Sequence, residues 1–146
     1  VGDGSDFRDR GAAGVGLASF AGLAAADDAL RRLILAPEDM AVTRETAFSL
    51  ARLNERAGLA VVVSALVSAD EDQSNWIASG LEDSLSFDPK GIDQAITHCR
   101  ALRAESDDSS SKAHELLLEF LPAVRAGTTG GRFGPYNRPH RRRWRR

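Results

Sequence analysis

The chain has 146 residues, of which 42% are hydrophobic and 27% are charged, and its formal net charge is −2. These totals are typical of one soluble globular domain, and they exclude a collagen, a coiled-coil rod and a wholly disordered chain. A single cysteine, Cys99, excludes a disulfide scaffold and a cysteine-rich zinc site. No apolar run approaches the roughly 20 residues of a membrane-spanning helix, so we expect no membrane span and a cytoplasmic location.

The first 20 residues are rich in glycine, alanine and aspartate and show no apolar period, so we predict a disordered segment over residues 1–20. A signal peptide is the alternative, because residues 11–26 carry no charge and end in a small-residue triplet of alanines. A signal peptide also needs a basic start and a strongly apolar middle. Acidic residues at the start and glycines in the middle therefore argue against secretion.

From residue 22 to residue 124, apolar side chains recur at i, i+3, i+4 and i+7, which is the spacing of amphipathic helices. No stretch shows the sustained alternation of a strand. Asp39 is expected to cap one helix, Asp72 another, and Pro89 to lie in a first turn, where proline is tolerated. The six helices predicted cover approximately residues 22–35, 39–54, 57–69, 73–85, 88–102 and 112–124.

A shift of 33 residues superimposes the third predicted helix on the fifth. The openings Gly58-Leu59 and Gly91-Ile92 then coincide, and we attribute the recurring glycine to a short corner that needs a permissive backbone. Because one helix pair cannot bury its apolar face alone, stacked pairs would form the core. The side chains expected to be buried together are Leu59, Val63, Leu66, Ile92, Ile96 and Cys99.

Residues 22–124 resemble HEAT-like and armadillo-like helical repeats. The resemblance is carried by the openings Gly58-Leu59 and Gly91-Ile92 and by the stretch 41–50 that leads into the first opening. The resemblance implies an all-α fold over residues 21–126, a short right-handed array of antiparallel helix pairs with disordered ends. It also implies that the chain binds another protein on a concave face, with no fixed chemistry. An irregular six-helix bundle is the alternative fold.

Residues with reactive side chains are few, and they match no catalytic or metal-binding motif. Cys99 takes an inward slot, which favours a core residue over a nucleophile, and His98 beside it points about 100° away around the helix. His114 is expected to be exposed. The acidic run 70–72 lacks the glycine and glutamate of a calcium loop. We therefore expect no catalysis, no cofactor and no metal ion.

The last 20 residues, 127–146, hold seven arginines and no acidic residue, so residues 1–126 carry a formal net charge of −9. Arginines interleaved with aromatic residues suit phosphate backbones and stack on bases. Weak nucleic-acid binding by this tail is thus the alternative function, and its affinity would fall steeply with salt. The same composition also suits an anionic membrane surface. The other interpretation is that the acidic body attracts its own tail, or that the tail is a solvated end without a role. The candidate polyanion-binding residues are Arg132, Arg138, Arg141, Arg142, Arg143, Trp144, Arg145 and Arg146.

The sixth predicted helix places apolar side chains on more than one face, yet no predicted helix follows it. An end repeat exposed to water should have a polar outer face. We therefore expect a partner protein or a second copy of the chain to cover this helix. The predicted interaction site is centred on Leu118, with Glu115 and Glu119 at its rim.

Overall fold

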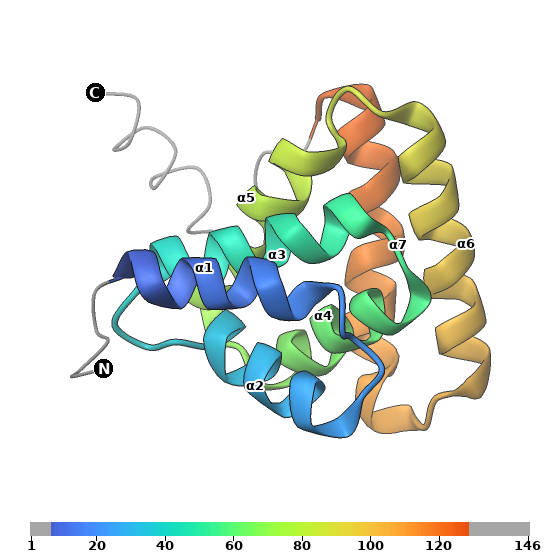
Figure 1. Cartoon of the computed structure of the whole chain (residues 1–146). Helices are drawn as coiled ribbons and strands as arrows, with labels where there is room; N and C mark the ends of the chain where they lie inside the picture. The colour runs from blue at the N-terminus through green and yellow to red at the C-terminus, as the bar shows by residue number, and fades with distance from the viewer. Residues whose placement is uncertain (1–6, 129–146) are drawn as a thin grey trace.

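The computed structural model describes residues 7–128, which form seven α-helices, one short 3₁₀ helix and no strand (Figure 1). The all-helical prediction is confirmed, but the count of six helices is one too low. In chain order the elements are α1 (Phe7–Ala18), α2 (Ala24–Ile34), α3 (Met40–Leu53), α4 (Arg56–Ser68), α5 (Glu71–Leu85), α6 (Pro89–Glu105), η1 (Asp108–Ser110) and α7 (Ser111–Ala126). None of these helices is both long and apolar enough to cross a membrane.

The first six helices pack in two rows. One row consists of α1, α3 and α5, in which the contact between α3 and α5 is the most extensive of the fold. In the other row α4 lies between α2 and α6. Figure 1 shows α1 and α3 side by side and running in the same direction. The last helix, α7, packs mainly on α6 and α4, so it closes one end of the molecule.

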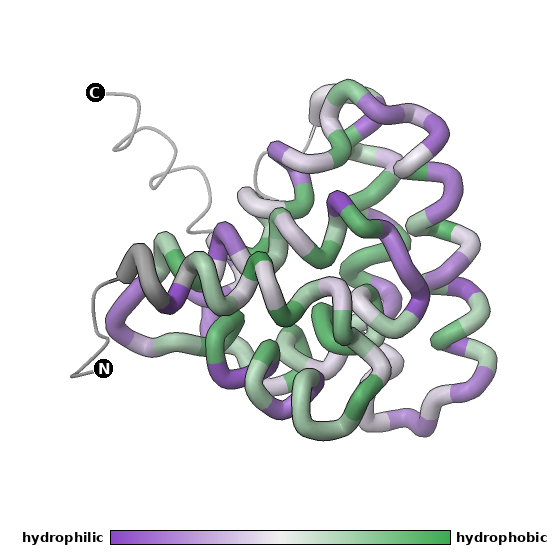
Figure 2. The backbone as a smooth tube through the Cα atoms, viewed as in Figure 1, coloured by the Kyte–Doolittle hydropathy of each residue, from purple (hydrophilic) through white to green (hydrophobic). Residues whose placement is uncertain are grey.

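The core lies between the two rows, and it contains the side chains expected there. Leu59, Leu66, Ile92 and Cys99 are buried in one cluster together with Val63, while Ile96 is half-buried against it. The prediction of a shared core between α4 and α6 is confirmed. Figure 2 shows the underlying pattern, in which hydrophobic and hydrophilic residues alternate along the helices.

Helix α1 corrects the prediction of a disordered segment over residues 1–20, which is wrong for residues 7–18. This helix packs on α3 through small residues. A Cβ atom added to Gly14 would lie only 2.5 Å from Thr46 Oγ1. The Arg10 guanidinium also pairs with Asp39 at 3.1 Å. A search for large apolar residues misses such a helix, because its contact depends on close approach and not on side-chain volume.

The recurring glycines have a different role from the one expected. Gly58 and Gly91 lie inside the first turns of α4 and α6, and neither has a positive φ. A Cβ atom on Gly58 would lie 3.3 Å from Leu50 Cδ2, and one on Gly91 would collide with the carboxylate of Asp88. At both positions a side chain would have to displace a neighbouring side chain, so these glycines provide space and not a left-handed backbone. The left-handed backbone instead occurs at Asn54, which ends α3 with a φ of 52°.

Aspartate side chains cap the starts of three of the α-helices. As expected, the carboxylate of Asp39 accepts a hydrogen bond from the Val42 amide, and Pro89 lies in the first turn of α6 after its cap, Asp88. The start of α5 differs from the expectation, because Asp70 and not Asp72 is the cap. Its carboxylate accepts from the Gln73 amide at 2.8 Å, and the Gln73 side chain accepts from the Asp70 amide in return.

Candidate protein-binding cleft

Only one of the two sites predicted from the sequence lies within the described residues. All the predicted polyanion-binding residues, from Arg132 to Arg146, lie outside the described residues, so nucleic-acid binding by the tail stays a prediction. On α7, Glu119 is exposed, and Glu115 is exposed and hydrogen-bonded to Arg103 at 3.2 Å. Leu118 is half-buried against the core. Helix α7 packs on α6, α4 and η1, and the interaction site centred on Leu118 stays a prediction.

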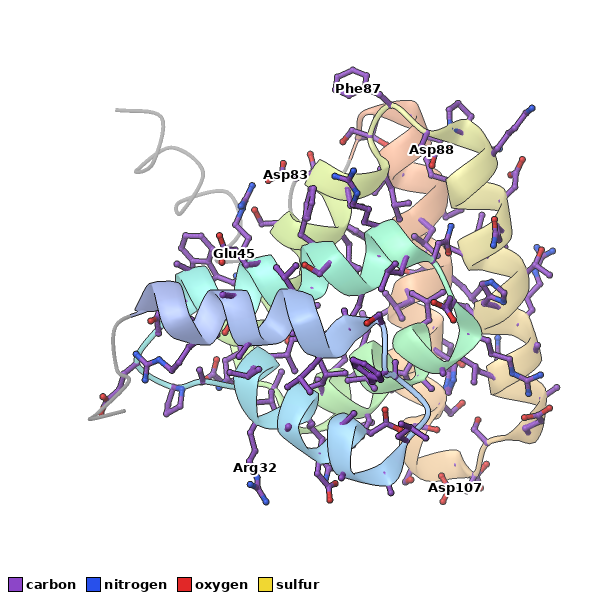
Figure 3. The ribbon with its side chains drawn as sticks, in the orientation of Figure 1. Arg32, Glu45, Asp83, Phe87, Asp88 and Asp107 are labelled. Carbon is purple, nitrogen blue, oxygen red and sulfur yellow. The ribbon has the colours of Figure 1, made fainter. Side chains whose placement is uncertain are left out.

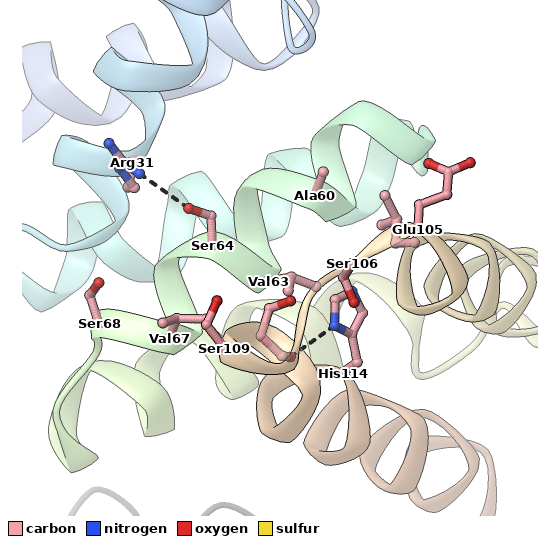
Figure 4. A pocket seen from close by; sticks show the side chains of 12 residues that line it. Arg31, Ala60, Val63, Ser64, Val67, Ser68, Glu105, Ser106, Ser109 and His114 are labelled. Atoms are coloured by element: carbon pink, nitrogen blue, oxygen red, sulfur yellow. Dashed lines mark hydrogen bonds between the residues drawn. The ribbon is translucent and has the colours of Figure 1, made fainter.

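A different surface is hollowed. An open cleft of about 460 Å³ lies over α4, between α2 on one side and the corner from α6 to α7 on the other (Figure 4). A smaller hollow of about 240 Å³ continues it and shares Arg31, Ala60 and Ser64 with the cleft. The two hollows together therefore form a continuous depression across α2, α4 and the start of α7.

The floor of the cleft is apolar. It is formed by Ala60, Val63 and Val67 of α4 together with Leu102 of α6. Val67 is 49% exposed, which makes it one of the few large apolar side chains of the described chain with so much open surface. Exposed apolar surface in a depression with a polar rim is typical of interaction sites.

His114 forms part of one wall of the cleft, and its position corrects the expectation of an exposed side chain. Only 2% of it is accessible to solvent. Its Nδ1 donates a hydrogen bond to the Ser110 carbonyl oxygen at 2.8 Å, and because a carbonyl can only accept, this bond places a proton on Nδ1. The Nε2 atom makes no hydrogen bond to any described residue. No serine of the cleft is thus paired with His114 as a nucleophile with its base.

Three serines around the end of α6 donate their hydroxyl hydrogens to nearby acceptors of the chain. Ser106 donates to the Arg103 carbonyl oxygen at 3.0 Å, and Ser110 donates to the Asp107 carbonyl oxygen at 3.4 Å. Ser109 donates to the Asp107 carboxylate, and this bond lowers the pKa of that carboxyl below its usual value. Figure 3 shows Asp107 at the corner, directed away from the helices. The corner is therefore held by local hydrogen bonds and carries a negative charge at neutral pH.

The opposite wall of the cleft carries a cation. Arg31 of α2 donates to Ser64 Oγ at 3.3 Å and lies 3.5 Å from the Asp28 carboxylate (Figure 4). At the far end, the carboxylate of Glu105 forms an ion pair with Arg56 and remains largely exposed. These exposed ion pairs contribute little to stability, about 0–1 kcal/mol each. They do fix where the charges lie around the apolar floor.

Cys99 is outside the cleft and has the properties of a core residue. It is fully buried in α6, as expected, and desolvation by this burial raises the pKa of its thiol to about 11. A thiol with such a pKa is a poor nucleophile at neutral pH, because the thiolate is the reactive form. Within residues 7–128, no three side chains of the ligating types gather closely enough to hold a metal ion.

The Cys99 thiol should react with Ellman's reagent at pH 8 at least about 100-fold more slowly in the native chain than in the chain unfolded by guanidinium, because so little of it is ionised. Because the thiol pKa is higher in the folded state than in the unfolded state, the burial of this thiol also makes the free energy of unfolding depend on pH. Its contribution is complete below the unfolded pKa of about 8.5 and is lost as the pH rises towards 11. Equal rates of thiol reaction in the native and unfolded chains would contradict the burial of Cys99.

Other exposed apolar side chains of the described residues stand outside the two hollows. Phe87, in the corner between α5 and α6, is 98% exposed, and Figure 3 shows it pointing away from the helices. Phe20 and Leu23, in the corner between α1 and α2, are 56% and 61% exposed. Neither corner contributes a residue to the two hollows, whereas Val67 lines the cleft.

Comparison with known proteins gives no relative: no family model, curated protein or solved structure matches this chain. The function of the chain therefore has to follow from the chemistry of its own surface.

Proposed function

We propose that the chain is a non-catalytic helical-repeat module that binds another protein, and that the cleft over α4 is its binding surface. The observation that carries this proposal is the exposed apolar floor around Val67, enclosed by hydrogen-bonded polar residues. Protein interfaces combine an apolar centre with a polar rim in the same way. The open shape favours a segment of a protein over a small molecule, because pockets for small ligands enclose most of the ligand.

The helix arrangement supports the repeat part of the proposal. Helices α1, α3 and α5 follow one another in one row, and α2, α4 and α6 in the other. Small residues recur at intervals of 33 along the first row, at Gly14, Ala47 and Gly80. A Cβ atom on Gly14 or Gly80 would collide with α3, so these positions mark the close crossings between neighbouring helices. With α1 included, the first six helices form three complete pairs, α1 with α2, α3 with α4 and α5 with α6.

Photo-crosslinking in cells that make the protein tests this function. A benzoylphenylalanine in place of Ser68, which is exposed at the rim of the cleft, should give one discrete adduct with a partner protein. The same residue in place of Arg52, an exposed residue of α3 outside the cleft, is the matched control and should give none. An adduct at the Arg52 position but not at the Ser68 position would contradict the proposal.

A further inference from the structure

Four polar residues along one wall of the cleft share a chemical property. Ser106, Ser109, Ser110 and His114 each donate their side-chain hydrogen to a nearby acceptor of the same chain. A hydroxyl oxygen that donates its hydrogen retains lone pairs, and so does Nε2 of a neutral imidazole protonated on Nδ1. This wall can therefore accept hydrogen bonds from a ligand, but these side chains have no further hydrogen to donate to one.

The charges around this wall have the matching sign. The carboxylate of Glu105 lines the cleft and stays largely exposed although it pairs with Arg56. Asp107, two positions later in the chain, adds a second carboxylate next to the lining serines. Helix α4 ends at Ser68 in the cleft without a basic residue in its last turn, so the negative end of its dipole is not compensated there. The cation of the opposite wall, Arg31, is already engaged by Ser64 and Asp28.

We propose that the cleft recognises a cationic side chain, an arginine or a lysine, in the partner protein. A guanidinium or an ammonium group offers only donors, five or three, and so complements a wall that only accepts. The aliphatic stem of either side chain would lie on the apolar floor formed by Val67 and Leu102, as such stems do on apolar surface elsewhere. This inference rests on the proposed function, because it names what that same cleft binds.

The test uses three acetylated and amidated pentapeptides, Ala-Leu-X-Leu-Ala, in which X is arginine, glutamine or glutamate. Each is titrated into the ¹⁵N-labelled full chain and followed by amide chemical shifts. The arginine peptide should shift the amides of Ser106, Ser109 and His114, and it should bind at least 5-fold more tightly than the glutamine peptide. The glutamate peptide should bind most weakly. Equal affinity of the arginine and glutamine peptides for the cleft would overturn the inference but leave the proposed function intact.

Variants separate the outcomes further. Glu105→Gln should weaken binding of the arginine peptide about 3-fold, whereas Glu45→Gln, which removes an exposed charge from α3 outside the cleft, should leave it unchanged. If all three peptides shifted only amides outside the cleft, the proposed function would be contradicted as well. A full chain with its seven tail arginines changed to glutamine should bind the arginine peptide with unchanged affinity. A several-fold gain would show that the tail fills the cleft, and would overturn the assignment to a partner.

Discussion

Gly80→Val should destabilise the protein by about 3 kcal/mol, because it inserts a side chain where two helices touch. A Cβ atom at this position of α5 would lie 2.4 Å from the carbonyl oxygen of Arg44 and 3.0 Å from the Ala47 Cβ and the Phe48 amide nitrogen. Two of these three atoms belong to the backbone of α3 and cannot rotate away. The two helices would have to separate along the most extensive contact of the fold.

The matched control is Gly16→Val in α1, where an added Cβ atom would meet nothing within 4 Å. Valine and glycine differ little in helix propensity, so this change should alter the free energy of unfolding by no more than about 0.5 kcal/mol. Urea denaturation followed by circular dichroism measures both variants. If Gly80→Val does not fold, Gly80→Ala should show a smaller loss of the same sign. Wild-type stability in Gly80→Ala would contradict the packing of α5 on α3.

Asn54→Ala should cost about 2–3 kcal/mol, because Asn54 has two separate roles at the end of α3. Its backbone is left-handed, with a φ of 52°, a conformation that asparagine tolerates and alanine does not. Its side-chain amide, which is buried, donates to the Gly91 carbonyl oxygen of α6 at 2.8 Å. The backbone carbonyl of Asn54 also accepts from His98 at 3.1 Å, and this bond should survive the substitution.

Asn54→Gly separates the two roles, since glycine relieves the left-handed strain but still lacks the amide. It should recover about 1 kcal/mol of the loss in Asn54→Ala, with the remainder reporting the lost hydrogen bond. Thermal unfolding of the three chains under one set of conditions is sufficient. Equal stability of the alanine and glycine variants would show that the conformation at Asn54 is not strained.

Most of the fold follows from local patterns in the sequence. The helices from α2 to α7 were predictable because large apolar residues recur along them at helical spacing, and the cap at Asp39 was predictable from its residue type. Helix α1 was not, because its buried contact is made by Gly14, whose lack of a side chain is what lets α3 approach. The role of Gly58 was also missed, since a sequence does not show which atom faces a glycine.

The cleft could not be predicted in the same way. Ser106, Ser110 and His114 look like polar residues of a connection and a helix start, and nothing in their spacing indicates that they line one cleft. Their role arises because η1 and α7 fold against α4, which brings them near Ser64 and Val67 from more than 35 positions earlier in the chain. The sequence also does not show how far packing covers Leu118, which is half-buried against the core.

The most direct test of the central claim measures the affinity of two variants for the crosslinked partner. In each variant an aspartate replaces an apolar residue of similar exposure. Val67, in the cleft, is 49% exposed, and Leu53, at the end of α3 outside the cleft, is 43% exposed. Both variants should fold, because neither side chain is part of the buried core. By isothermal titration calorimetry, Val67→Asp should weaken binding at least 10-fold while Leu53→Asp leaves the Kd unchanged. Full affinity in Val67→Asp, or a loss only in Leu53→Asp, would contradict the assignment of the cleft as the binding surface.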